Sequence, residues 1–588
     1  MKQYLENLYK EKSPYIKQIN GTIQLNSKYK LGKIVFLKEY AFLELLNNSS
    51  QKIYIDFDYL NGANNNDIVL VQIIFNPKGK TKAKVLKVLE RSKQTFLAFI
   101  QDKKLYSLQY NIVIDNNFIL ENYNEGDILK VEATQIKKLG NINNSSIDEI
   151  ISLYLYNQEY RLEQFPNEKF FLQSTTNRVD LTELDFCTID PNNAKDFDDA
   201  IYFDEKNSIL YVAIADVSAY ITIDSKIDLE AQKRAFSIYL PHKVFPMLPF
   251  ELSNNLCSLV SNKQRASFVF KLYLDLDQMI VKKSELFEAT IISKHRYTYK
   301  EIDTILQKAN KDNYFVKLFK ITKQFKQKRL KKGYDFRSHE IKLILNNNQE
   351  LIATELEKST PSHSLVEECM LLANCEAAKR IQNLGVFRVH EEPSQNNIIK
   401  LLDDIKALGI KVKLKSTIHE TIQYIQKKAK EVNLQADVDW LIIQAQQQAH
   451  YSNKSNIHFG LGFESYSHFT SPIRRYADLI LHRILKTNKI PKDLDTIVEY
   501  LSDTQRKIDQ LVWDFEDRKY ARWASKNIGQ SFKAKMIDID NFIAVIDDKI
   551  SGARVKILNY AGEKQFMQIE IILESANIIT KEITARII

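Results

Sequence analysis

The chain has 588 residues, 44% of them hydrophobic and 27% charged, which is the composition of a globular protein too long for one hydrophobic core. Its formal net charge of +9 is compatible with a polyanionic partner, and its four cysteines form no C-x-x-C pair that would indicate a zinc site. No apolar stretch approaches the ~18 residues that span a bilayer, and residues 1–12 lack the apolar core of a signal peptide. We therefore expect a cytoplasmic protein that does not enter a membrane.

Short β-rich runs, separated by turns that contain Asn and Gly, occupy residues 18–140. Runs of this length without long helices predict small β-barrels. The tripeptide Gly79-Lys80-Thr81 imitates the end of a Walker loop, but Ile74 stands where that loop requires glycine. We therefore expect no nucleotide-driven motor. A polar linker is predicted to follow over residues 141–148.

Four carboxylates, Asp190, Asp196, Asp198 and Asp199, lie between two hydrophobic runs that we predict to be buried strands. Like charges this close repel unless a cation neutralises them, and oxygen ligands favour Mg²⁺ or Mn²⁺. Such a cation is the usual means of activating water against a phosphodiester. The residues alone leave two alternatives open, a solvated acidic turn and a structural calcium loop. The calcium loop does not have EF-hand spacing, because its sixth position lacks Gly and its twelfth lacks Glu.

An ordered series of motifs continues from these acids. Thr188 to Ala200 is similar to the pattern T-I-D-x-x-x-A-x-D-F-D-D-A of the ribonuclease II/ribonuclease R family. Ala219, where the family commonly has His, and Phe250 depart from the family pattern without touching the carboxylates. Further blocks resemble the family in the same order at residues 214–218, 239–241, 246–249, 252–254, 256–259, 367–374, 458–461 and 470–476.

The resemblance implies a multidomain α+β fold, with N-terminal cold-shock or OB-type barrels, a central mixed α/β RNB catalytic domain and a C-terminal S1-like OB barrel. The expected domains are residues 1–75 (first cold-shock-like barrel), 76–150 (second cold-shock-like barrel), 151–525 (catalytic domain) and 526–588 (S1-like barrel). The chain stops at Ile588 without a Lys-rich tail, which looks closer to ribonuclease II than to ribonuclease R.

The implied function is a processive 3′→5′ hydrolytic exoribonuclease that degrades single-stranded RNA to nucleoside 5′-monophosphates in RNA turnover, with Mg²⁺ or Mn²⁺ as cofactor. We expect it to act as a monomer. Two alternatives stay open: a non-catalytic RNA-binding protein of cold-shock and S1-like modules, and a metal-dependent endoribonuclease. Duplex unwinding and the length of the limit product depend on the RNA channel and are not predicted from the sequence.

The resemblance also implies roles for individual residues. Asp190, Asp196, Asp198 and Asp199 would form the metal cluster, and the planar fork of Arg474 would suit the charge on the scissile phosphate. Without the family match, a surface ion pair would be the simpler explanation of Arg474.

The expected RNA contacts include three aromatic residues, Tyr239, Tyr299 and Phe336, on which bases could stack. An acid of the helix motif is expected near the terminal nucleotide. Glu368 is favoured over Glu367, because the pattern from Ser364 to Glu367 is a capping box that explains Glu367 structurally. Arg475 and, in the C-terminal barrel, Phe532, Phe542, Lys533 and Lys535 complete the candidates, although core or surface roles are the simpler explanation of these barrel residues.

Overall fold

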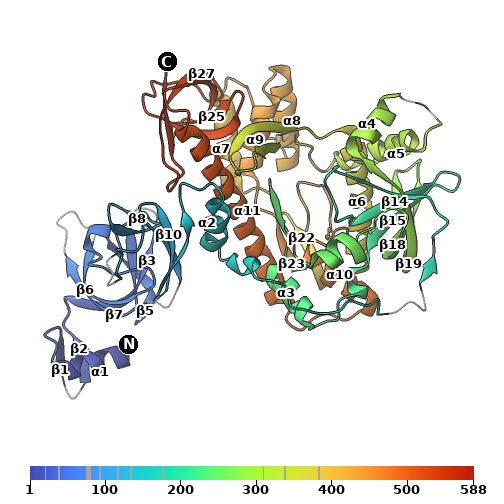
Figure 1. The fold of residues 1–588 in the computed structure, drawn as a ribbon. Coiled ribbons are helices and arrows are strands. Elements are labelled where there is room, and N and C mark those ends of the chain that lie inside the picture. Colours follow the sequence, from blue (N-terminus) through green and yellow to red (C-terminus); the bar gives the residue numbers. More distant parts are fainter. Residues whose placement is uncertain are drawn as a thin grey trace.

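The computed structural model describes residues 1–19, 22–37, 40–74, 81–91, 95–114, 118–132, 135–173, 178–308, 310, 312–336, 340–381 and 384–588. Gly79 and Lys80 of the Walker-like tripeptide lie outside these residues. Figure 1 shows a β-rich N-terminal part beside a larger body that contains both helices and strands, with the C-terminal barrel at one corner of that body. None of the described helices is long and apolar enough to cross a membrane.

The first barrel is closed by strands from both sides of the predicted boundary at residues 75/76. It follows α1 (Lys2–Lys10) and the hairpin of β1 (Ile16–Ile19) and β2 (Thr22–Leu25). The strand order is β3-β4-β5-β7-β6, with β3 (Tyr29–Phe36), β4 (Ala41–Leu45), β5 (Asn48–Ile55), β6 (Ile68–Ile74) and β7 (Lys82–Glu90). The predicted boundary is therefore wrong: it separates β6 from β7, which pair along their length as one antiparallel hairpin.

The second N-terminal unit is a four-stranded sheet in the described residues, where the sequence predicted a barrel. Its order is β11-β10-β8-β9, with β8 (Phe96–Gln101), β9 (Lys104–Ser107), β10 (Asp127–Val131) and β11 (Ile136–Asn141). Helix α2 (Ile147–Leu155) packs on this sheet through Ile147 and Ile151. A Cβ at Gly140 would lie 2.5 Å from Ile147 Cδ1, so glycine permits this approach. The predicted linker therefore ends earlier than expected, because its last two residues open α2.

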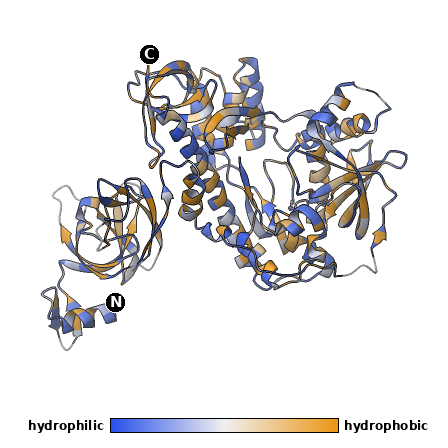
Figure 2. Ribbon diagram, viewed as in Figure 1, coloured by the Kyte–Doolittle hydropathy of each residue, from blue (hydrophilic) through white to orange (hydrophobic). Residues whose placement is uncertain are grey.

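The larger body is organised by one sheet of order β12-β19-β13-β14-β15-β18, which an additional β19–β18 pairing closes. Its strands are β12 (Val179–Asp180), β13 (Phe186–Asp190), β14 (Asp199–Asp204), β15 (Ile209–Ala215), β18 (Gln264–Asp275) and β19 (Ile280–Thr298). All seven residues of β15 are buried, so this strand reads as a continuous apolar run rather than an alternating one. Figure 2 shows the hydrophobic colour gathered on these strands.

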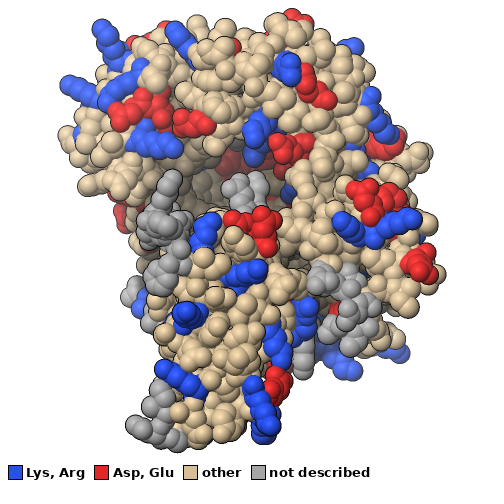
Figure 3. Space-filling view, turned by 90° about the vertical axis from the view of Figure 1, so that its left-hand side faces the viewer, with Lys and Arg blue, Asp and Glu red and all other residues tan. Residues whose placement is uncertain are grey.

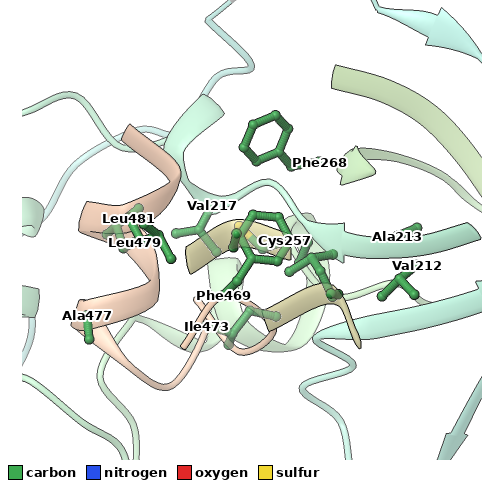
Figure 4. Packing of buried hydrophobic residues seen from close by; sticks show 14 of the residues in the cluster. Val212, Ala213, Val217, Cys257, Phe268, Phe469, Ile473, Ala477, Leu479 and Leu481 are labelled. Carbon is green, nitrogen blue, oxygen red and sulfur yellow. The ribbon is translucent and has the colours of Figure 1, made fainter. Parts of the chain in front are cut away.

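Helices pack around this sheet and continue beyond it. They are α3 (Lys226–Arg234), α4 (Tyr299–Lys308), α5 (Tyr314–Arg329), α6 (Pro361–Arg380), α7 (Gln395–Ala407), α8 (Ile418–Glu431), α9 (Gln435–Ala445), α10 (Tyr476–Thr487) and α11 (Leu494–Ser525). Figure 4 shows Phe469 and Ile473 in the core between the apolar side chains of α10 and Val212 and Ala213 of β15, all in one hydrophobic cluster. Ile473 is only 1% exposed, so the segment just before Arg474 is anchored in the core.

Three two-stranded sheets and one closed barrel complete the body. The remaining strands are β16 (Ile238–Leu240) with β17 (Lys243–Phe245), β20 (Glu340–Leu345) with β21 (Leu351–Glu357), β22 (Leu384–Val389) with β23 (His450–Lys454), and the closed C-terminal barrel of β24 (Ser531–Asp538), β25 (Ile543–Asp547), β26 (Ser551–Ile557), β28 (Ile583–Ile587) and β27 (Gln568–Ala576). Lys535 of this barrel pairs with Asp437 of α9, and Phe532 packs on Trp523 of α11. These two candidate RNA contacts therefore already have partners within the protein.

Buried ion pairs join the N-terminal sheet, α11 and the C-terminal barrel. Asp148 of α2 accepts hydrogen bonds from Arg522 and forms an ion pair with Lys519, both on α11. Asp514 of α11 pairs with Arg518 and with Lys581 of the barrel. Because a buried charge without its partner costs several kcal/mol, these pairs hold the three parts in one arrangement.

Two histidines meet at the H-F-G-L motif: His458, its first residue, and His390. Gly460 donates its N–H to His390 Nδ1 at 3.0 Å, and a Cβ at Gly460 would lie 2.9 Å from that nitrogen. The ring of His458 lies 5.2 Å from that of His390. Burial, together with His390 and Arg388, lowers the pKa of His458 to about 3. The folded protein therefore keeps His458 uncharged well below neutral pH.

This pair of histidines predicts a loss of stability in acid. An unfolded chain protonates His458 below about pH 6.5, whereas the folded chain does not do so until about pH 3. The unfolded state then binds more protons, so stability falls as the pH is lowered through this window, by about 1.4 kcal/mol for each unit of pKa difference. We expect the melting temperature to fall less steeply between pH 6.5 and 4 in His458→Asn than in the wild type. The exposed His295→Asn serves as control, and equal slopes in all three proteins would contradict this prediction.

Candidate active site

The four acids lie at the edge of the catalytic sheet. Asp190 ends β13 and Asp199 begins β14, and these two strands are paired antiparallel. The loop between them is anchored by Ser258, whose Oγ accepts the Phe197 N–H at 3.0 Å and donates to the Lys195 carbonyl at 2.7 Å. The motif around Ser258 therefore fixes the loop that carries Asp196 and Asp198.

Asp198 joins the acid loop to the Arg474 segment. Its Oδ1 accepts the backbone N–H of Ile473 at 2.9 Å, and its Oδ2 accepts Arg474 Nε at 3.2 Å. Arg474 Nη2 also donates to Ser471 Oγ at 3.0 Å. The side chain of Asp198 is 5% exposed and that of Arg474 is 44% exposed, so the guanidinium is held on one side and open to solvent on the other.

Burial and mutual repulsion oppose ionisation of these acids. Burial raises the pKa of Asp198 to about 8, although Arg474 and the Ile473 N–H act in the opposite direction. Burial also raises the pKa of Asp190, and repulsion from Asp199, Asp198 and Asp196 raises it further. A nearby cation would reverse this effect, because its charge favours the ionised carboxylates.

The donor chemistry fits a hard cation. Asp190 Oδ2 is buried and, among the described residues, no hydrogen-bond partner contacts it. Its neighbours are carboxylates, the ligands that Mg²⁺ and Mn²⁺ prefer. In the part of the chain that the structure describes, however, no group of three or more His, Cys, Asp or Glu side chains is arranged to hold a metal ion. The type and number of carboxylates therefore suit a divalent cation, but in the described residues their side chains are not arranged as a set of metal ligands.

Tyr239, one of the expected RNA contacts, lies against the acid loop. Its hydroxyl donates to Asp196 Oδ2 at 2.5 Å, and its side chain is 44% exposed. Desolvation and the Asp196 carboxylate raise the pKa of Tyr239, so the phenol stays protonated and able to donate. One edge of the ring therefore holds the acid loop while the remainder is accessible.

The other two predicted aromatic contacts lie in different surroundings. Tyr299 opens α4, and its ring stacks on His363 of α6 with ring centres 3.8 Å apart. Desolvation, together with the charges of Asp199 and Asp190, raises the pKa of Tyr299. Phe336 instead packs with Tyr334 on the cluster formed by α7, α8 and α9.

Two of the charged residues expected to contact RNA, Glu368 and Arg475, form ion pairs within the protein. Glu368 is 2% exposed and binds Arg329, with a shortest distance of 2.5 Å. Glu367 is exposed, and α6 begins at Pro361 with a capping box between Thr360 and His363, not at Ser364. This placement favours Glu367 for contact with a ligand, against our preference for Glu368.

Arg475 is held within the protein. Its Nε and Nη2 donate to the two carboxylate oxygens of Asp478 at 2.8 and 2.7 Å, at the start of α10. This pairing gives it a structural role beside Arg474. Sequence reasoning missed Ser471 and His363, which position Arg474 and Tyr299. Ser471 lay within the T-S-P-I-R-R-Y motif, whereas nothing local marked His363 as a stacking partner.

Comparison with known proteins identifies the family. Residues 178–489, more than half of the chain, match the RNB domain. The chain is 33% identical to ribonuclease R of Helicobacter pylori strain ATCC 700392 / 26695 over 490 residues, which cover 78% of this chain and 74% of that protein. It is 30% identical to ribonuclease R of Thermotoga maritima over 593 residues, with coverages of 90% and 83%. The chain belongs to the ribonuclease II/ribonuclease R family.

Membership in this family confirms that the protein is an RNB-domain 3′→5′ exoribonuclease, as the sequence predicted. The apo form of Mycoplasma genitalium RNase R has the same fold, with a TM-score of 0.79 at 24% identity over 95% of this chain and all of that chain. RNB-type ribonucleases are metal-dependent hydrolases. The three relatives compared above are all ribonuclease R proteins.

Proposed function

We propose that this exoribonuclease removes nucleotides one after another from the 3′ end of single-stranded RNA, releasing nucleoside 5′-monophosphates by hydrolysis. The observation that carries the proposal is the junction of Asp198 with Arg474 and the Ile473 N–H, next to the Asp196–Tyr239 hydrogen bond. Acids, a half-open guanidinium and an accessible aromatic ring meet here. A phosphodiester and its terminal nucleotide require these three kinds of group.

The proposed cofactor is Mg²⁺, with Mn²⁺ as a substitute, held among Asp190, Asp196, Asp198 and Asp199. When bound there, it would supply an activated water and neutralise charge on the phosphate. Arg474 would bind a phosphate oxygen through its open side while Asp198 and Ser471 hold its orientation. Tyr239 would keep Asp196 in place and present its ring to the last nucleotide.

The proposed organisation keeps four parts but moves the first boundary to the segment after β7, which ends at Glu90. The first barrel, the four-stranded sheet and the C-terminal barrel would bind the RNA that leads to the site. Figure 3 shows a hollow on the face that carries the N-terminal part, with Asp and Glu side chains beside it and Lys and Arg spread over the surface. We further propose a cytoplasmic monomer that works without a nucleotide-driven motor of its own.

The test is digestion of end-labelled single-stranded RNA by the purified protein with Mg²⁺. We expect a ladder that shortens from the 3′ end and 5′-monophosphates as products. Release of diphosphates that depends on inorganic phosphate would identify a phosphorolytic enzyme and refute hydrolysis. A circular RNA of the same sequence should stay intact, and cuts in it would identify an endonuclease. RNA binding without shortening would identify a binding protein.

Tyr239→Ala is expected to change the final product more than the initial rate on long RNA. A long substrate is held by many phosphate contacts, so the loss of one stacking platform of ~1–3 kcal/mol hardly changes its occupancy. A short remnant depends on the groups beside the acids and should be released early. Denaturing gels should show a limit product at least one nucleotide longer. Tyr239→Phe, which keeps the ring and loses the bond to Asp196, separates stacking from support of the loop. A lower rate on long RNA with an unchanged limit product would assign Tyr239 to general packing.

A further inference from the structure

The turn of the hairpin that carries Tyr239 is held from outside the catalytic sheet. Strands β16 and β17 form a two-stranded sheet in which Tyr239 pairs with Val244. Glu149 of α2 reaches the turn of this hairpin. Its Oε2 lies 2.8 Å from His242 Nε2, and its Oε1 accepts Lys243 Nζ at 3.0 Å. One carboxylate therefore holds His242 in the turn with one oxygen and Lys243, the first residue of β17, with the other.

The Glu149–His242 half of this contact is enclosed, whereas the Lys243 side chain is 44% exposed. The side chains of Glu149 and His242 are 12% and 17% exposed, and the His242 ring stacks on Phe515 of α11. Burial opposes ionisation of Glu149, but the bonds from His242 and Lys243 outweigh it and lower its pKa. The group that holds the turn is therefore a carboxylate. An enclosed pair of this kind is more directional than the exposed pairs that contribute little.

The hairpin needs such support because two strands alone are marginally stable in water. Its base is fixed to the Arg474 segment, where Ser237 donates its N–H to the Arg474 carbonyl at 3.0 Å. Its turn is fixed by Glu149 of α2. Between these two attachments stands Tyr239, whose hydroxyl holds Asp196. Both ends must be fixed for the ring to keep its place beside the acids.

Helix α2 is itself rigidly held. Asp148, the neighbour of Glu149, is paired with Lys519 and Arg522 in the interior, and Ile147 and Ile151 are buried against the four-stranded N-terminal sheet. The contact that Glu149 makes with the hairpin is therefore connected through α2 to the four-stranded N-terminal sheet.

We propose that Glu149 is a positioning residue for RNA degradation: through His242 and Lys243 it sets the hairpin so that Tyr239 grips the 3′-terminal nucleotide. This inference rests on the proposed role of Tyr239. A contact that only stabilised the fold would change the melting temperature and leave the product pattern unchanged. A positioning contact changes the product pattern in the way that loss of Tyr239 does.

The experiment compares Glu149→Gln with the wild type in the full-length protein. We expect a limit product longer by at least one nucleotide, and a kcat/KM about tenfold lower on RNA of a few nucleotides, the effect of losing one stacking contact. The initial rate on long RNA should stay within about twofold, for the same reason that Tyr239→Ala spares it. The control is Glu163→Gln, an exposed carboxylate, which should give the wild-type product.

A double variant tests whether the effect passes through Tyr239. Glu149→Gln combined with Tyr239→Ala should give the same limit product as Tyr239→Ala alone, because contacts that act as a unit are not additive. Additive lengthening would overturn the inference. If Glu149→Gln does not fold, His242→Phe serves instead, because it keeps a ring on Phe515 and removes the nitrogen that meets Glu149.

The outcomes separate this inference from the proposed function. If Tyr239→Ala lengthens the product while Glu149→Gln and His242→Phe give the wild-type product, only the role of Glu149 is overturned. If Tyr239→Ala leaves the product unchanged, the grip by Tyr239 and the role of Glu149 fail together, whereas hydrolysis from the 3′ end is still judged by the labelled-RNA assay.

Discussion

Asp198→Asn is expected to abolish RNA cleavage while RNA affinity stays within about tenfold of the wild type, since phosphate contacts elsewhere supply most of the affinity. The amide can still accept the Ile473 N–H, so the local backbone should keep its place. What is lost is the negative charge that Arg474 contacts and that a bound cation would need. The loss should therefore fall on turnover rather than on folding or binding.

The measurement combines turnover of labelled RNA with RNA binding by fluorescence anisotropy. Asp185→Asn is the matched control, because Asp185 lies just before β13 with a side chain that is 78% exposed. It should retain wild-type turnover. If Asp198→Asn keeps more than about a tenth of normal turnover, it keeps far more than a variant without an essential catalytic group should. Such a result would remove Asp198 from the site.

Arg474→Lys is expected to lower kcat roughly 100-fold or more, the scale of deleting one transition-state donor. Lysine keeps the charge but cannot replace a planar fork whose Nε binds Asp198 and whose Nη2 binds Ser471 while one side faces solvent. Because the interaction develops with charge on the phosphate, KM should change much less than kcat.

Single-turnover kinetics on a short RNA would measure this effect. Arg506→Lys, at a surface arginine that pairs with Asp503 in its own helix turn, is the control and should behave as wild type. Ser471→Ala should give a smaller loss than Arg474→Lys, because Asp198 still orients the guanidinium. A near-normal kcat in Arg474→Lys would reduce Arg474 to background electrostatics.

The sequence by itself determined the features that are local in the chain. The apolar runs on both sides of the acid loop predicted β13 and β14, and the order of the motifs predicted the RNB region. Strand pattern and motif spacing are written in neighbouring residues, so they can be recognised without coordinates. The choice of Tyr239 as an expected RNA contact followed from the family resemblance rather than from any local pattern.

Only the tertiary structure decided which distant side chains meet. Asp198 and Arg474 are 276 residues apart in the chain. Two expected RNA contacts have partners within the protein, because Glu368 pairs with Arg329 and Arg475 pairs with Asp478. The same holds for β7, which completes the first barrel by pairing with β6, and for Glu149, which reaches the hairpin of Tyr239 from 93 residues away. The hydrophobic pattern of the sequence predicts which residues are buried, and the residue type shows which of them are charged. The partner of each residue is set by how whole elements pack, because burial leaves each charge stable only where the fold supplies its counterpart.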